Sequence, residues 1–129
     1  MTATYIPDRK DAAIVFVIDG GGLAITTGVK GDIQIPFACT ITAATLLADQ
    51  SSSIAVDVWK DTYSNYPPTV ADTITASAKP TLSTAVKSTN STLTGWTTSL
   101  LAGDILRFNV DSVSTAQRVT LILTVEKVG

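Results

Sequence analysis

Apolar and polar residues alternate with a period of two along much of the chain, which is the spacing of β-strands. The clearest stretch is Ile33–Ile41, where every second residue from Ile33 onward is a large apolar residue or Cys39, and Gln34, Pro36, Ala38 and Thr40 point the other way. Ile54–Trp59 alternates as well, and this phase puts Asp57 on the solvent face of its strand. Ile105–Val110 and Arg118–Lys127 repeat the pattern near the end of the sequence. Each of these segments predicts a strand with one buried face.

Other segments predict strands by composition rather than by alternation. Ala12–Ile18 is a nearly continuous apolar run, which predicts a strand buried on both faces and ended by the turn residues 19–22. Shorter strands are predicted at Leu23–Thr27, Ala43–Ala48, Ser91–Leu93 and Trp96–Leu100. A long loop follows Trp59, and within it Val70–Ile74 fits either one helical turn or a short strand.

About eight short strands separated by turn residues predict an all-β fold, an antiparallel β-sandwich of the jelly-roll kind. Pro7 and the charged residues after it predict an extended N-terminal arm over residues 1–11, which leaves residues 12–129 for the sandwich domain. A chain of 129 residues buries enough surface to fold without a disulfide or a metal ion.

The amino-acid composition is typical of a β-protein and argues against nucleic-acid and membrane partners. Charged residues make up 16% of the chain, below the typical value of about 25%, and Ser and Thr supply much of the polar surface. Glu126 is the only Glu, which is unusual for a helical protein. The net charge is −2 without a basic cluster, so no nucleic-acid partner is expected. There is no apolar run of membrane-spanning length and no signal peptide, so we expect no membrane partner and synthesis in a cytoplasm.

The residues that usually perform catalysis are scarce. The chain has no His, and its one cysteine, Cys39, falls on the apolar face of the best alternating segment, which predicts a buried structural thiol. Zinc needs several Cys or His ligands. Asp57 and Asp61 on either side of Trp59 form the one arrangement suggestive of sugar hydrolysis, and a solvent-facing Asp57 beside a loop Asp61 is the simpler interpretation. We therefore expect no enzyme activity, no catalytic residues, no metal site and no cofactor.

Aromatic residues gather at the start of the long loop. Trp59, Tyr63 and Tyr66 lie close to Pro67 and Pro68. Exposed Tyr and Trp side chains on loops are common at interfaces and as platforms for sugar rings. This aromatic cluster is a candidate binding surface, and the alternative is that it covers one end of the core.

Several stretches are similar to a domain that recurs in structural proteins of tailed bacteriophages. The similarity spans residues 13–125, and the stretches that carry it are Ile25–Asp32, Ile35–Ile41, Leu46–Ser51, Val56–Tyr63, Pro67–Asp72, Lys79–Pro80, Leu93–Trp96 and Ala102–Ser112. The resemblance implies a component of a tail fibre, a head fibre or a capsid-associated protein, often a homotrimer. It brings no catalytic residue to this chain.

Within that family, the small size of the chain favours a capsid decoration (cement) protein, because a fibre subunit usually adds an anchor and a shaft. The expected partners are the major capsid protein and two further copies of the chain, and the expected location is the capsid surface of the virion. We expect the arm to contact the capsid through Tyr5, Ile6, Pro7, Asp8, Arg9 and Lys10. The alternative is a receptor- or glycan-binding module of a fibre that binds through Trp59, Tyr63 and Tyr66.

Overall fold

A computed structural model describes residues 10–128, and within that range the chain forms seven antiparallel strands. The strands are β1 (Asp11–Asp19), β2 (Gly28–Gln34), β3 (Cys39–Asp61), β4 (Thr81–Asn90), β5 (Ser99–Leu100), β6 (Ile105–Val113) and β7 (Arg118–Lys127). The only helical element in the described range is the 3₁₀ turn η1 (Val70–Asp72). The prediction of an all-β antiparallel fold is confirmed at this level.

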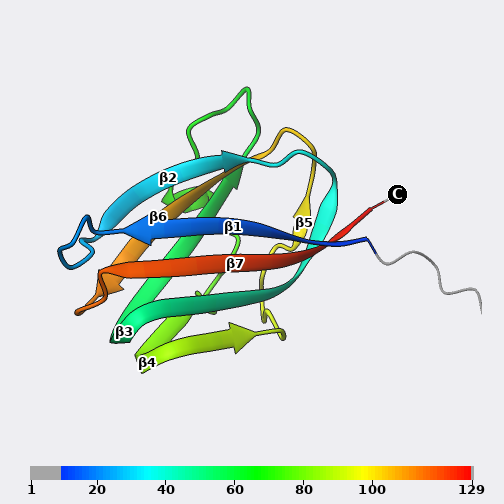
Figure 1. Cartoon of the computed structure of the whole chain (residues 1–129). Helices are drawn as coiled ribbons and strands as arrows, with labels where there is room; N and C mark the ends of the chain where they lie inside the picture. The colour runs from blue at the N-terminus through cyan, green and yellow to red at the C-terminus, as the bar shows by residue number, and fades with distance from the viewer. Residues whose placement is uncertain (1–9, 129) are drawn as a thin grey trace, which may run out of the picture.

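The long strand β3 is shared by two layers of one curled sheet. Its first part, Cys39–Ala48, pairs with β7, and its last part, Ile54–Asp61, pairs with β6. The strand order is β1-β7-β3-β6-β2, and β4 and β5 pair with the other side of β3. Figure 1 shows β1 and β7 crossing in front of β6, so the two halves of the sheet face each other in a sandwich-like arrangement.

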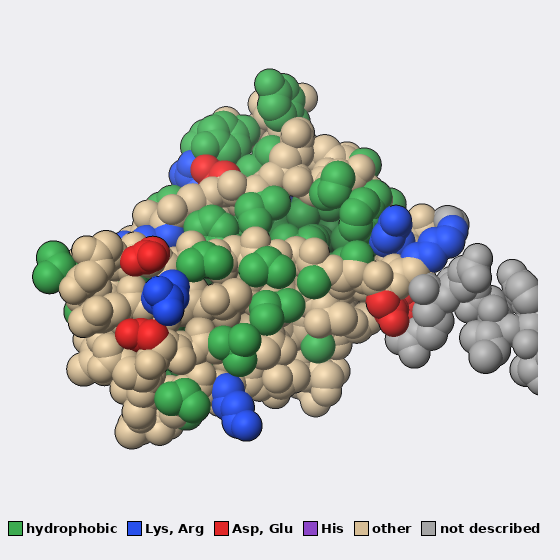
Figure 2. Space-filling view, viewed as in Figure 1, with side chains coloured by type: hydrophobic (Ala, Val, Ile, Leu, Met, Phe, Trp, Pro, Cys, Tyr) green, Lys and Arg blue, Asp and Glu red, His purple; other side chains and the backbone are tan. Residues whose placement is uncertain are grey.

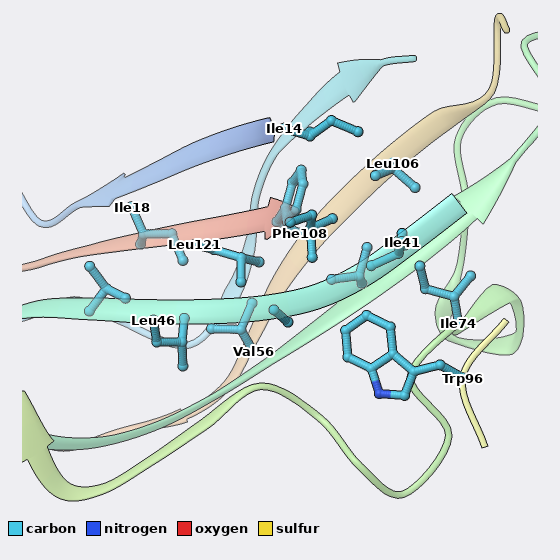
Figure 3. Close-up of a cluster of buried hydrophobic side chains, with 14 of the residues drawn as sticks. Ile14, Ile18, Ile41, Leu46, Val56, Ile74, Trp96, Leu106, Phe108 and Leu121 are labelled. Atoms are coloured by element: carbon cyan, nitrogen blue, oxygen red, sulfur yellow. The ribbon is translucent and has the colours of Figure 1, made fainter. Parts of the chain in front are cut away.

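The core fills the space between the two layers. Side chains from both layers, among them Ile18, Leu121 and Phe108, meet there (Figure 3). The Phe16 and Phe108 rings stack with centroids 4.3 Å apart and planes within 9° of parallel. The inward face of β7 was predicted from its alternation, and its four apolar residues Val119, Leu121, Leu123 and Val125 are fully buried, so that prediction is confirmed.

The prediction that Ala12–Ile18 is buried on both faces is wrong. Ile14 and Ile18 point into the core, whereas Val15 and Val17 are each 50% exposed on the outer face. β1 lies at the edge of the sheet, and none of the described elements packs over its outer side. Figure 2 shows the resulting apolar patch over β1, β7 and β3. A continuous apolar run therefore does not here mark a strand covered on both sides.

The predicted single strand Ile33–Ile41 is two strands joined by a corner. β2 ends at Gln34 and β3 begins at Cys39, because the chain crosses from one layer to the other at this point. Ile35 is fully buried at the corner, where its N–H donates to the Asp104 carbonyl and its carbonyl accepts from the Gly103 N–H. Pro36 follows, and since it has no N–H it leaves no donor unsatisfied in the corner.

The strand predicted at Ala43–Ala48 does not stop at the polar residues 49–53. β3 continues through them, because residues 114–118 of the neighbouring segment provide polar partners. The buried Ser52 hydroxyl accepts from the N–H groups of Thr115 and Ala116 at 3.2 and 3.0 Å, and lies 3.1 Å from the Ser114 hydroxyl. Satisfied hydroxyls let a run of serines occupy a strand.

Three shorter predictions also change. Leu23–Thr27 has no strand, and the strand predicted at Ser91–Leu93 is a turn after β4, where Asn90 Oδ1 accepts from the N–H groups of Thr92 and Leu93. The strand predicted at Trp96–Leu100 is reduced to the two residues of β5. Of the two alternatives for Val70–Ile74, the helical turn is correct, as η1.

Candidate functional site

Two surfaces stand out, and the first is the outer side of β1, β7 and the first half of β3. Cross-strand register sets Val15 beside Ile122, and Ile122 beside Thr45. The next row sets Val17 beside Thr120, and Thr120 beside Leu47, which is 44% exposed. We call this surface the valine face, and define it by Val15, Val17, Thr45, Leu47, Thr120 and Ile122. These six side chains carry no charge.

Charged residues bound the valine face at both ends. At one end Asp19 and Arg118 are cross-strand partners, and Asp49 Oδ1 accepts from the Arg118 N–H at 3.2 Å. That hydrogen bond lowers the pKa of the Asp49 carboxyl. At the other end Asp11 pairs in register with Glu126. Figure 2 shows red and blue side chains on both sides of the apolar patch. An apolar centre with a charged rim is the usual anatomy of a protein–protein contact.

The second surface is a hollow lined by Tyr63, Tyr66 and Ile105, which we call the tyrosine hollow. Tyr63 is 73% exposed and Tyr66 is 48% exposed, whereas Ile105 is buried at the base. The two tyrosines come from the loop that follows β3, and Ile105 begins β6. A hollow lined by two exposed aromatic rings and a buried apolar residue suits a ligand with a flat apolar face.

A fixed ion pair flanks the tyrosine hollow. Asp32 on β2 and Arg107 on β6 are cross-strand partners, and Arg107 Nε and Nη2 donate to the two Asp32 carboxylate oxygens at 2.7 and 3.1 Å. The Tyr66 hydroxyl donates to Asp32 Oδ2 at 2.7 Å and accepts from Arg107 Nη2 at 3.0 Å. The Arg107 guanidinium lies 5.3 Å from the centre of the Tyr66 ring. These contacts hold Tyr66 in one place.

The ion pair also changes the acidity of its members. The hydrogen bonds from Arg107 hold the pKa of the Asp32 carboxyl below its ordinary value of 3.8, and the Tyr66 hydroxyl adds to the effect. The Asp32 carboxylate in turn raises the pKa of the Arg107 guanidinium. Both groups are therefore charged at neutral pH, and together they are neutral.

The loop that carries the tyrosines is held by its own hydrogen bonds. Asp61 Oδ1 accepts from the Thr62 N–H and from Asn65 Nδ2, at 2.7 and 3.3 Å. The Asn65 N–H donates to the Thr62 carbonyl, and the Tyr66 N–H donates to the Tyr63 carbonyl. Asp61 thus shapes a turn in this structure.

Trp59 lies apart from the hollow lining, half-buried on β3. Its indole Nε1 donates to Asp57 Oδ2 at 2.9 Å. Asp57 was predicted to face solvent, and that prediction is wrong, because the carboxylate is 1% exposed. Its Oδ1 accepts from the hydroxyls of Thr73 and Thr75 at 2.6 and 2.7 Å, so the segment after η1 covers it. Lys79 Nζ lies 4.0 Å from Oδ2.

The other residues singled out from the sequence lie as follows. Tyr5 to Arg9 of the expected arm fall outside the described residues. Lys10 is exposed, and its carbonyl accepts from the Lys127 N–H at 2.8 Å. Cys39 is buried, as predicted, and its burial raises the pKa of the thiol.

Residues 10–128 hold neither a cluster of metal-binding side chains nor a membrane-spanning helix. No three Asp, Glu, Cys or His side chains there come together as a metal ion would require. No helix in the same range is long and apolar enough to cross a membrane.

Sequence reasoning missed the valine face and the partners of Tyr66. Asp32 and Arg107 both occupy outward positions of predicted strands, and this was the one feature of the sequence that pointed to them as surface residues. Nothing in the alternation said that these two strands are neighbours. Compared with known proteins, the chain matches no protein-family model, no curated protein and no solved structure.

Proposed function

We propose that this chain is a structural protein of a tailed-bacteriophage virion, a capsid decoration protein that binds the assembled head as a homotrimer. We also propose that its sandwich-like fold is of the jelly-roll kind. Such a protein acts by mass action, because a ligand that binds only the assembled shell stabilises that shell. The sequence resemblance over residues 13–125 supports the virion assignment.

The observation that carries the proposal is the valine face. Val15 and Val17 each leave half of their surface in water, and Leu47 leaves nearly as much. Burial of apolar surface contributes about 25 cal/mol per Å², so covering this face stabilises an assembly. An uncharged sheet face of this kind fits contact with another protein surface.

We assign the valine face to contact between copies of the chain. Both of its ends carry charged residues, with Asp19 and Arg118 at one end and the acidic pair Asp11 and Glu126 at the other. A neighbouring copy brings charges of both signs to the same rim, so each copy has opposite charges within reach. In a trimer with cyclic symmetry, three such faces turn toward a common axis.

This contact is tested by measuring the mass of the protein in solution by light scattering after size-exclusion chromatography. The unaltered chain is expected to have three times the mass of one chain, and Val17→Lys the mass of one chain with an unchanged circular dichroism spectrum. Val70→Lys is the matched control, since Val70 is 65% exposed on η1, outside the valine face. A single-chain mass for the unaltered protein, or an intact trimer in Val17→Lys, contradicts the assignment.

We assign capsid contact to the arm, Tyr5 to Lys10. The truncation that tests it removes residues 1–9 and keeps Lys10, because the Lys10 carbonyl accepts from the Lys127 N–H at the start of β1. We expect the truncated protein to remain folded and trimeric and to lose co-sedimentation with capsids of the phage that encodes it. Undiminished co-sedimentation would refute the role of the arm.

Copy number in purified virions separates the decoration protein from the fibre component. Hundreds of copies per particle indicate a capsid lattice, and a handful indicates a tail or head fibre. Quantitative mass spectrometry against the major capsid protein gives this ratio directly.

A further inference from the structure

The tyrosine hollow has the composition of a site for a sugar ring. Tyr63 and Tyr66 present aromatic surface to solvent, and the buried Ile105 lines the same hollow. A pyranose has one face of C–H bonds, which stacks on an aromatic ring, and an edge of hydroxyls, which needs polar partners. The exposed rings supply the first requirement.

The Asp32–Arg107 pair supplies the second requirement. Arg107 uses Nε and Nη2 for Asp32 and Tyr66, while the two N–H groups of its Nη1 have no protein acceptor among residues 10–128. Asp32 Oδ1 accepts only from Arg107 Nε in that range and keeps one lone pair free. The Arg107 and Asp32 side chains remain 19% and 25% exposed. Donors and an acceptor therefore stand next to the tyrosine rings, fixed in place.

The charge at this site selects the class of sugar. Asp32 and Arg107 neutralise each other, and both keep their charge at neutral pH. A phosphate or a carboxylate on the ligand would have to displace Asp32 from Arg107. Hydroxyl groups, in contrast, both donate and accept, so they fit beside the intact pair.

The site is organised before any ligand arrives. Tyr66 is bound through its hydroxyl to Asp32 and Arg107, and hydrogen bonds from Asp61, Thr62 and Asn65 fix the turn that carries Tyr63. Side chains that are already ordered lose little entropy on binding. Tyr63 is 73% exposed on this ordered loop, so its ring is accessible to a ligand.

We propose that the tyrosine hollow binds one pyranose ring of a neutral glycan, which stacks on Tyr63 and Tyr66 and hydrogen-bonds to Arg107 and Asp32. This binding is a second activity, separate from trimer formation through the valine face. It gives the protein a means to hold a particle at a glycan-covered surface.

The test is a titration followed by amide NMR spectra of the ¹⁵N-labelled full chain. The probes are the methyl glycosides of glucose, galactose, mannose and N-acetylglucosamine, and a β1,4-linked and an α1,4-linked glucose disaccharide. At least one probe is expected to shift the amides of residues 62–66 and 105–107, with a Kd on the order of 1 mM. Tyr63→Ala is expected to weaken binding about tenfold, and Tyr63→Phe, which keeps the ring, to stay within about twofold.

Two controls separate the outcomes. Leu23→Ala removes an apolar side chain that is also 73% exposed, from the turn between β1 and β2, and should leave binding unchanged. Val17→Lys should bind the same probes as the unaltered chain, so failure of the trimer leaves this test intact. The proposal is overturned if no probe shifts these amides at about 50 mM, a concentration well above the expected Kd. It is also overturned if the shifts map to other residues or if Tyr63→Ala binds as tightly as the unaltered chain.

Discussion

The Thr73 hydroxyl donates a 2.6 Å hydrogen bond to Oδ1 of Asp57, sixteen positions earlier in the chain. Thr75, Val58 and Trp59 donate to the same carboxylate, so four donors converge on one buried acid. A buried charge is tolerated when its hydrogen bonds are complete. This network fastens the segment after η1 onto β3.

Replacing Asp57 by Asn should therefore destabilise the fold by about 2–3 kcal/mol. The amide has one acceptor where the carboxylate has two, so the Trp59 indole or the threonine hydroxyls lose a partner. Urea unfolding measures the change. Asp111→Asn is the control, because its ion pair with Lys79 is partly exposed and should contribute less than about 1 kcal/mol. Equal midpoints for Asp57→Asn and the unaltered chain would refute this role.

Ser52→Ala tests why β3 runs on through a serine-rich stretch. The substitution leaves the N–H groups of Thr115 and Ala116 without their acceptor, and we expect a loss of about 1–2 kcal/mol in unfolding free energy. Ser83→Ala, at an exposed position of β4, should change little. Similar small effects for both variants would mean that water replaces the Ser52 hydroxyl.

Asp32 predicts a specific acid sensitivity. Its pKa is lowered in the folded state by Arg107, so its stabilising effect is complete above the unfolded value of about 3.9 and disappears as the pH falls through the lower folded value. The melting temperature of Asp32→Asn should thus be lower than that of the unaltered chain at pH 7, and the gap should close once the pH has fallen below the lowered folded pKa of Asp32. Thermal scans from neutral to acidic pH measure the gap. A gap independent of pH contradicts the assignment.

Cys39 should resist thiol reagents in the native protein. The side chain is 1% exposed, and burial raises the pKa of its thiol, so little thiolate is available to react. We expect labelling by a disulfide reagent to be complete in urea and very slow in buffer. Fast labelling of the folded protein would show that the first residues of β3 open locally.

The alternation of apolar and polar residues predicted several of the strands and their buried faces. The inward residues of β7, from Val119 to Val125, were predicted because that strand has one covered face and one polar face. Alternation failed for Asp57, and the continuous apolar run of Ala12–Ile18 failed for Val15 and Val17. A period of two says which residues share a face, and it does not say what covers that face. Val15 and Val17 lie on an uncovered face, and Asp57 lies beneath the segment after η1.

The candidate site shows the same division. Tyr63 and Tyr66 were found from residue type and from their place in a loop, which the sequence displays. Asp32 and Arg107 were not found, because their contact depends on β2 and β6 being neighbours. Strand order is set by the packing of the whole sheet, and no local pattern encodes it.

The pairing of β1 with β7 has a consequence for how the protein is made. β1 emerges from the ribosome well before its partner residues 118–126. Until β7 has emerged, Ile14 and Ile18 have neither their hydrogen-bonded neighbour nor a closed core. The nascent chain therefore exposes an unpaired strand with apolar side chains. The sheet is thus completed only after β7 has been made, and interruption of translation anywhere before β7 leaves a fragment prone to aggregation.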